Sequence, residues 1–288
     1  VGGTGKTPAT ILFFFLFISE FLVAVLSRGY RGGAEKLKIP MFLSQGSGPI
    51  HKASYCGDEP YLISENLPKA IVIVGKNRHV ASKMAAKAGA HLILLDDGMQ
   101  HRQVARDLEV VLMDIQDPFG GKHLLPRGYL REDLSGLSRA HLIILNHVEN
   151  HQQFLQVKQE LLQFTKAAIV GCRLQVNQVE DLKGKSIASL RGKKVGLFCA
   201  IAKPQRFKET VMSEGAHVLD EYFISDHLPF EPSKLEKFAI SCKQKGIEML
   251  LCTEKDSVKF ADFLEVSLPV FNVKVKLKLI EGDIEWKT

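Results

Sequence analysis

Short runs of apolar residues recur along the chain, each bounded by glycine, polar or charged residues. Between several of them lie stretches with helical spacing, such as 80–88 and 152–164. Apolar runs that alternate with helices predict the strands of a mainly parallel sheet with both faces covered. The runs expected to form strands are 21–26, 70–74, 91–95, 110–113, 141–145, 168–170, 194–199, 249–252 and 270–275. The pattern therefore predicts an α/β fold.

The length of 288 residues favours two domains, at roughly 150 residues each. The alternation of strands and helices is least clear at 173–192, a polar stretch rich in Lys, Gln and Asn. We therefore expect a first domain at 1–172, a linker or hinge at 173–192, and a smaller α/β domain at 193–288.

The run 9–26 is almost wholly apolar. A helix that spans a membrane needs about 20 such residues, and this run is interrupted by Ser19 and Glu20. It also lacks the basic start and the cleavage site of a signal peptide. The favoured interpretation is a buried helix followed by a buried strand at 21–26, with membrane contact as the alternative.

Composition and charge narrow the class of partner. Hydrophobic residues make up 45% and charged residues 24% of the chain, which are values of a globular protein. The net charge of +6 favours an anionic partner, such as phosphate or an acidic lipid. The basic residues are dispersed without interleaved aromatic residues, so we expect no nucleic-acid binding. No feature indicates a protein partner. The five cysteines include no C-x-x-C pair, which favours buried thiols in a reducing cytoplasm.

The strongest chemical motif is VGGTGKT at 1–7. Its glycines allow backbone amides to surround phosphate oxygens, while Lys6 reaches the β- and γ-phosphates and the Thr7 hydroxyl binds Mg²⁺. The full P-loop pattern needs a glycine one position before Val1, so a glycine-rich turn before a chance Lys-Thr is the alternative. The expected nucleotide-binding residues here are Gly2, Gly3, Thr4, Gly5, Lys6 and Thr7.

Acidic residues follow two of the predicted elements. Asp96 and Asp97 end the apolar run 91–95, where P-loop enzymes hold Mg²⁺, and Gln100 and His101 follow at the same rim. In GDEP at 57–60, Asp58 and Glu59 either begin a helix or supply a general base and a metal ligand.

Two basic loops suit an anionic substrate, although each could equally be a solvated surface loop. One is 124–132, with Arg127 and Arg131, and the other is 27–33. His227, in SDH at 225–227, is of interest only if the fold brings it near Asp58.

Together these motifs resemble those of the tetraacyldisaccharide 4′-kinase family. The matching stretches are VGGTGKTP at 1–8, LSRGY at 26–30, GDEP at 57–60, LLDDGMQHRQVARDLEVVLMD at 94–114, FGGKHLLPRGYLRE at 119–132, KPQRF at 203–207, SDH at 225–227 and TEKDSVK at 253–259.

The resemblance implies a P-loop NTPase-like α/β/α sandwich with a second, smaller α/β domain. It implies transfer of the γ-phosphate of ATP to the 4′-hydroxyl of a lipid-linked glucosamine disaccharide 1-phosphate, which gives lipid IVA in lipid A biosynthesis. Mg²⁺ is the expected second cofactor, and the cytoplasmic face of the bacterial inner membrane, with its anionic surface, is the expected location of a peripheral enzyme.

The resemblance also implies roles for single residues. Asp58 is expected to be the catalytic base with His227 assisting it, and Asp97 and Arg131 are expected to act on the transferring phosphoryl group. Glu59 and Asp96 join Thr7 at the metal. Gln100, His101 and Glu132 complete the site.

Three departures from the family pattern are visible. The family has a helix and a strand before the P-loop, which this sequence does not include. The loop 126–133 reads PRGYLRED where PAGPLREP is common, and Lys203 stands where Asn is common. The alternative function is therefore a truncated homologue that folds and binds nucleotide weakly without kinase activity.

Overall fold

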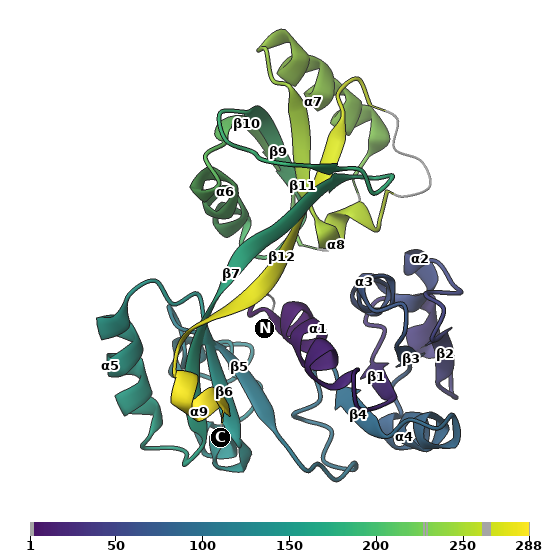
Figure 1. The fold of residues 1–288 in the computed structure, drawn as a ribbon, viewed down its shortest axis with the longest axis vertical. Helices are drawn as coiled ribbons and strands as arrows, with labels where there is room; N and C mark the ends of the chain where they lie inside the picture. The colour runs from purple at the N-terminus through teal and green to yellow at the C-terminus, as the bar shows by residue number, and fades with distance from the viewer. Residues whose placement is uncertain (1–2, 227, 229, 261–265, 288) are drawn as a thin grey trace.

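The computed structural model describes residues 3–226, 228, 230–260 and 266–287, and it consists of two lobes. Two long antiparallel strands, β7 (Ala168–Asp181) and β12 (Val270–Glu281), run from one lobe into the other (Figure 1). The predicted linker at 173–192 coincides with the second half of β7, the short strand β8 (Ser186–Ile187) and the turns beside it. The division into domains at residues 172 and 193 stays a prediction.

The first lobe contains a four-stranded sheet in the order β2-β3-β1-β4. Its central strands, β1 (Val23–Ser27) and β3 (Ile71–Val74), are buried at every position. Helices α1 (Lys6–Phe17) and α3 (Asp58–Asn66) cover one face, and α4 (Arg78–Lys87) covers the other. Burial on both faces explains why these strands are continuous apolar runs. The edge strands are β2 (Met41–Gln45), which is antiparallel to β3, and β4 (Leu92–Leu95).

The second sheet crosses both lobes in the order β10-β9-β11-β12-β7-β6-β5. Within it, β5 (Val110–Asp114), β6 (Leu142–Asn146) and the first half of β7 are parallel and belong to the first lobe. The second lobe contributes parallel strands and two covering helices: β9 (Lys194–Cys199), β10 (His217–Phe223), β11 (Met249–Thr253), α6 (Pro204–Ser213) and α7 (Pro232–Gln244).

The remaining helices are shorter or peripheral. Helix α5 (His151–Leu161) packs on β6 through Phe154 and Leu161. The others are α2 (Ala53–Cys56), α8 (Glu254–Ser257), α9 (Asp283–Lys287) and the 3₁₀ turns η1 (Gly33–Lys36), η2 (Gly120–Lys122) and η3 (Leu134–Arg139).

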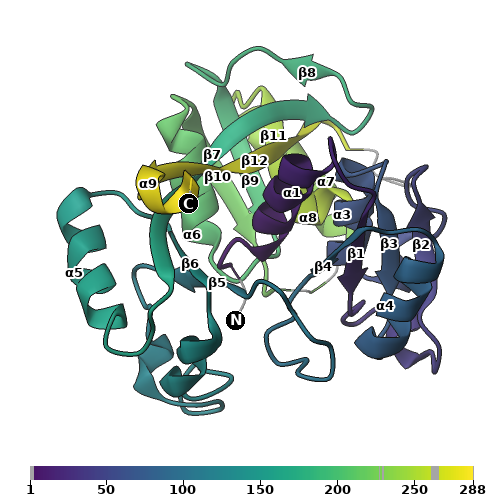
Figure 2. The same ribbon diagram turned by 60° about the horizontal axis from the view of Figure 1, so that its bottom comes forward.

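A cavity of about 870 Å³ separates the two sheets within the first lobe. Residues of β4 and β5 line it, together with Ala9, Phe13 and Phe17 of α1, which lies above the space between the two strands (Figure 2). Among the described residues, β4 pairs only with β1, and β5 pairs only with β6. Both strands are accordingly less buried than β1 and β3.

The prediction of an α/β fold with mainly parallel strands is confirmed. Each predicted strand is present, most within a few residues of the expected limits. The runs 168–170 and 270–275 are wrong at their ends, because β7 and β12 continue to Asp181 and Glu281. β2, β8 and β10 were not predicted. The prediction of a buried helix in the run 9–26 is wrong for part of its surface. In α1, Ala9 and Phe14 are buried, but Phe15 and Leu16 are exposed because the helix packs on the sheets along one side.

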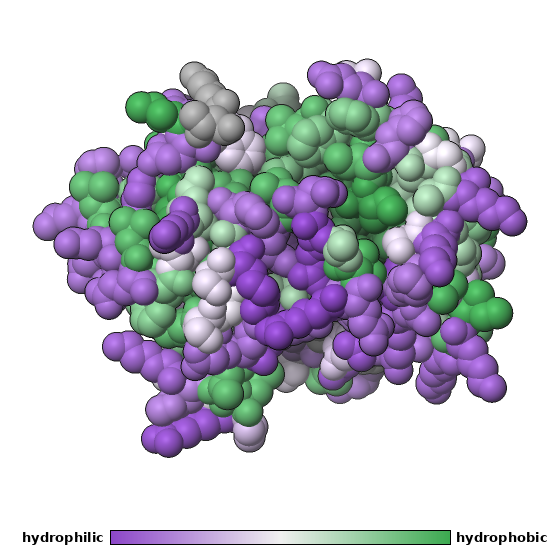
Figure 3. All heavy atoms as spheres, turned by 90° about the horizontal axis from the view of Figure 1, so that it is seen from below, coloured by the Kyte–Doolittle hydropathy of each residue, from purple (hydrophilic) through white to green (hydrophobic). Residues whose placement is uncertain are grey.

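No helix in the described part of the chain is long and apolar enough to cross a membrane. On the face seen in Figure 3, hydrophobic side chains form separate patches among hydrophilic ones. All five cysteines are free and buried, as expected of small apolar side chains in a core.

Candidate active site

The glycine-rich loop turns directly into α1. Gly3 (φ 82°) and Gly5 (φ 91°) take left-handed backbone conformations that favour glycine. A Cβ atom on Gly5 would lie 2.5 Å from Nδ2 of Asn146, which donates a hydrogen bond to the Thr4 carbonyl at 3.0 Å. The end of β6 therefore holds the loop in place. The first-turn amides of α1 have no acceptor within the helix, so this loop is suited to an anion.

Asp97 links two cations beside this loop. Its carboxylate lies 3.9 Å from Nζ of Lys6 and accepts a hydrogen bond from Arg131 at 2.7 Å. Burial alone would raise the pKa of Asp97, but Lys6 and then Arg131 outweigh burial and lower it. Lys6, Asp97 and Arg131 thus form a chain of charges from the loop to the basic segment at 124–132.

Asp96 has the opposite electrostatic environment. It is buried at the end of β4 and accepts a hydrogen bond from the Ser27 hydroxyl at 3.0 Å. Burial, and then the nearby charge of Glu59, raise the pKa of Asp96 to about 6. The buried Arg78 donates to the backbone carbonyl of Asp96 and holds the strand end. Asp96 and Glu59, two of the residues predicted to bind metal, are therefore close enough for their charges to interact.

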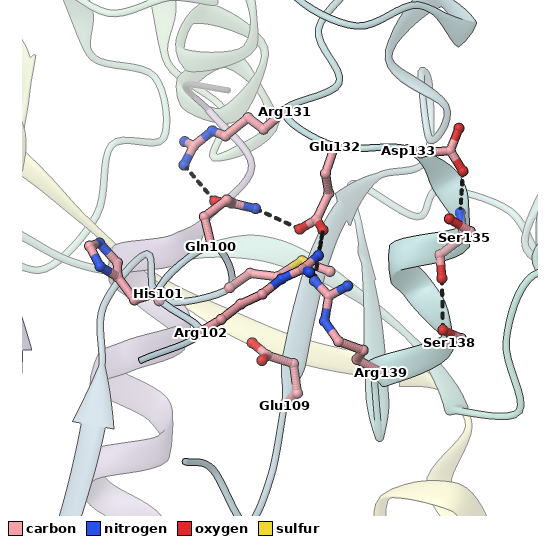
Figure 4. Close-up of polar contacts among 12 residues, drawn as sticks. Gln100, His101, Arg102, Glu109, Arg131, Glu132, Asp133, Ser135, Ser138 and Arg139 are labelled. Atoms are coloured by element: carbon pink, nitrogen blue, oxygen red, sulfur yellow. Dashed lines mark hydrogen bonds and ion pairs between the residues drawn. The ribbon is translucent and has the colours of Figure 1, made fainter. Parts of the chain in front are cut away.

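Glu132 organises the polar residues at the rim of the site. Gln100 donates a hydrogen bond to it at 2.9 Å, and Arg102 and Arg139 form ion pairs with its other oxygen. Figure 4 shows Gln100 between Arg131 and Glu132. These contacts hold Arg131 against Asp97 from a second side.

His101 lies apart from the Glu132 contacts in Figure 4. Burial, and then the charges of Arg78 and Arg28, lower its pKa. Its ring is consequently neutral at physiological pH and can accept as well as donate a hydrogen bond.

The acidic pair Asp58 and Glu59 begins α3, directly after Gly57, which has a positive φ. Both carboxylates face lysines of the second lobe: Lys259 is 3.7 Å from Asp58, and Lys255 is 3.7 Å from Glu59. The pair lies on a second cavity of about 330 Å³, formed by residues of both lobes. His227 lies outside the described residues, so its expected approach to Asp58 stays a prediction.

The structure places most, but not all, of the predicted residues of the first lobe on the cavity beside the loop, with Asp58 and Glu59 on the second cavity instead. Thr4, Lys6, Asp96, Asp97, Gln100, Arg131 and Glu132 line the larger cavity, and Thr7 lies in the first turn of α1. Gly2 is outside the described residues. The catalytic and binding roles of all these residues stay predictions.

Several residues that lie in the site had no role assigned from the sequence. Ser27 and Asn146 directly follow the predicted strands 21–26 and 141–145, and Arg78 lies shortly after 70–74, so position at the carboxyl end of a strand was the available signal. Lys255 and Lys259 lie in the TEKDSVK stretch. This stretch matches the family, but the resemblance implied no role for its residues.

Comparisons with known proteins agree with this site. The profile of the tetraacyldisaccharide-1-P 4′-kinase family matches residues 1–286. The chain belongs to this family.

Its relatives include a tetraacyldisaccharide 4′-kinase of Halothermothrix orenii, which is 34% identical over 96% of this chain and 78% of the relative. The enzyme of Syntrophotalea carbinolica is 36% identical over the whole chain and 79% of the relative. The second comparison covers the whole chain and so includes the glycine-rich loop and the second lobe.

The fold also matches a solved structure, that of LpxK from Aquifex aeolicus in complex with ATP. The TM-score is 0.75 with 25% sequence identity, over 100% of this chain and 84% of the other. The P-loop-like α/β fold implied by the family resemblance is therefore confirmed.

Proposed function

We propose that this kinase-family chain transfers the γ-phosphoryl group of ATP to the 4′-hydroxyl of a tetraacylated glucosamine disaccharide 1-phosphate. The observation that carries the proposal is the contact chain from Lys6 through Asp97 to Arg131 beside the glycine-rich loop. Phosphoryl transfer depends on positioning and on neutralising charge at the phosphate oxygens, and these groups surround the place where an anion binds best.

Asp58 is the proposed general base. The substrate oxygen attacks the γ-phosphorus as the bond to the β,γ-bridging oxygen breaks, and its proton passes to the Asp58 carboxylate. Asp58 can accept this proton because the start of α3 and the ammonium of Lys259 both favour its ionised form. His227 assists this carboxylate in the proposal, and Arg131 neutralises the developing charge.

The donor set fits Mg²⁺. Asp96 and Glu59 interact unfavourably enough to contribute to the raised pKa of Asp96, and a divalent cation between such oxygens would remove that repulsion. Thr7 supplies a hydroxyl oxygen of the same hard type. When bound, Mg²⁺ would neutralise charge on the β- and γ-phosphate oxygens.

The lipid substrate and the charge of the chain support a peripheral location on the anionic surface of the inner membrane. The face is the cytoplasmic one, where ATP is available. Exposed Tyr30, Leu124 and Tyr129 lie near Arg31 and Arg127 in sequence, which combines apolar and basic contacts in the two loops expected to meet the substrate.

Transfer of labelled phosphate from [γ-³²P]ATP to the tetraacyl disaccharide 1-phosphate tests the proposal. We expect a labelled lipid product, and we expect Lys6→Ala to reduce its formation by about 100-fold or more with the fold retained. Lys83→Ala, an exposed lysine on α4, is the matched control. If the rate of Lys6→Ala is within about tenfold of the parent rate, the P-loop assignment is wrong. If the parent binds ATP but transfers no phosphate, the chain is the inactive homologue.

A further inference from the structure

A cluster of charges joins the lobes beside the glycine-rich loop. Asp114 ends β5 in the first lobe, and Lys203 and Arg206 come from the start of α6 in the second. Arg206 donates to both Asp114 oxygens at 2.8 and 2.9 Å, and Nζ of Lys203 lies 2.5 Å from Oδ2. His147 stands 3.6 Å from the same carboxylate.

Asp114 is fully ionised in this cluster. Burial alone would raise its pKa, but hydrogen bonds from His147, Arg206 and Lys203 outweigh burial and hold the pKa well below its usual range. One carboxylate therefore faces two permanent cations. The planar fork of Arg206 alone satisfies both oxygens, so the charge of Lys203 exceeds what Asp114 needs.

The two cations differ in exposure. The Arg206 side chain is 16% exposed, whereas that of Lys203 is 42% exposed. Lys203 occupies the N-cap position of α6, where the helix dipole disfavours a cation unless an anion is near. Lys203 can consequently change its partner at lower cost than Arg206.

The stem of Lys203 lies directly against the glycine-rich loop. A Cβ atom on Gly3 would contact Cγ and Cδ of Lys203 at 3.9 Å. Lys203 also lines the cavity that Thr4 and Lys6 line. A rotation about its four-carbon stem is therefore enough to turn the ammonium from Asp114 toward a ligand held by the loop.

We propose that Lys203 is a second-lobe ligand for the phosphate chain of the nucleotide. This inference rests on the proposed function. When nucleotide binds, the Lys203 ammonium exchanges the Asp114 carboxylate for a phosphate oxygen, and Arg206 keeps Asp114 neutralised. The lobe that carries Lys203 and Lys259 is thereby tied to the loaded P-loop.

Calorimetric titration with ADP and ATP tests this role in the full chain. We expect Lys203→Met to weaken binding of both nucleotides by about tenfold, the loss of one charge-assisted hydrogen bond, and Lys203→Arg to restore most of it. Lys208→Met is the matched control, because Lys208 lies on the same helix but pairs with Glu221 at 3.1 Å. Parent-like affinity of Lys203→Met would overturn the proposal.

A second readout separates a ligand from a purely structural tie. If Lys203 only joined the lobes, Lys203→Met would lower the melting temperature without nucleotide and leave the rise caused by ADP unchanged. We expect instead a smaller rise with ADP. The transfer assay separates the two hypotheses. Absence of labelled lipid product from the parent contradicts the proposed function, whereas parent-like ADP binding by Lys203→Met in a chain that forms product contradicts this inference alone.

Discussion

At the scale of single residues, adjacent carboxylates in the site carry different charge because their neighbours differ. Asp97 meets Lys6 and Arg131 and stays ionised, while its neighbour Asp96 is buried near Glu59 and has a pKa of about 6. Asp58 differs from both, since it begins a helix and faces Lys259. These differences support the proposed roles, in which Asp96 binds a metal and Asp58 accepts a proton, while Asp97 holds Lys6 and Arg131 in place.

The role of Asp58 predicts a specific kinetic defect. Asp58→Ala is expected to lower kcat by about 10²–10⁴-fold and to change KM for ATP little, because a general base acts in the chemical step. Steady-state kinetics with varied ATP measures both constants. Glu214→Ala, an exposed acid, serves as the control. A defect confined to KM would make Asp58 a binding residue.

At the scale of elements, the two sheets of the first lobe end at strands with one unpaired edge. Among the described residues, β4 and β5 each have a single neighbouring strand and border the same cavity. By contrast, β1 lies between β3 and β4, and β6 lies between β5 and β7. The P-loop and Asp97 therefore lie beside strands whose backbone is paired on one side only.

This difference predicts uneven amide hydrogen exchange. Along a parallel strand, backbone N–H groups point alternately to the two sides, so about half of those in β4 and β5 face the cavity. We expect these amides to exchange faster than any in β1 and β6, because they lack a strand partner. Exchange measured by NMR or mass spectrometry checks the prediction, with β3 as an internal reference. Uniform protection across all five strands would contradict it.

At the scale of the whole molecule, β7 and β12 connect the lobes, and side-chain ion pairs cross between them on either side of the site. The Asp114 cluster lies beside the glycine-rich loop, and Lys255 and Lys259 reach the acids of α3. Because these contacts are ion pairs, the stability that they contribute to the contact between the lobes depends on pH.

Asp114 sets the sign of that dependence. Its pKa in the folded chain lies well below the unfolded value of about 3.9, so its stabilisation is complete at neutral pH and declines as the pH falls below about 5. Asp114→Asn is expected to lose about 3 kcal/mol at pH 7 and progressively less toward pH 4. Urea unfolding at several pH values measures the difference, with Asp117→Asn as control. If the free energies of unfolding of the parent and Asp114→Asn change with pH in parallel, Asp114 does not cause this pH dependence.

The charge of the molecule also predicts preference for anionic lipid. Arg28, Arg31 and Arg127 are the basic residues of the two loops that lie outside the larger cavity. Arg28 contacts Glu35 at 3.2 Å but is half exposed, whereas Arg131 is bound to Asp97 inside the cavity. Each is worth about 1 kcal/mol near such a surface, so replacing all three with Gln is expected to weaken sedimentation with anionic vesicles at least about tenfold. Replacing Lys234, Lys237 and Lys243 of α7 is the control. Equal binding of the parent to neutral and anionic vesicles would remove the electrostatic argument.

The sequence alone determined the fold class, most strands and the chemistry of the loop. A strand covered on both faces must be apolar throughout, so β1, β3, β9 and β11 were visible as runs. The G-K-T motif predicted an anion site because only backbone amides, a lysine and a hydroxyl are needed there. β10 was missed because its residues alternate between exposed and partly buried positions and it contains charges.

Tertiary structure alone decided which charges meet. Asp96 and Asp97 are neighbours in sequence, yet one is buried beside Ser27 and the other pairs with Arg131, 34 residues away. Lys203 likewise lies against Gly3 and contacts Asp114 only because α6 packs beside the first lobe. Sequence patterns report which face of an element is buried, whereas the charge state and partners of a side chain depend on the distances and desolvation that folding creates.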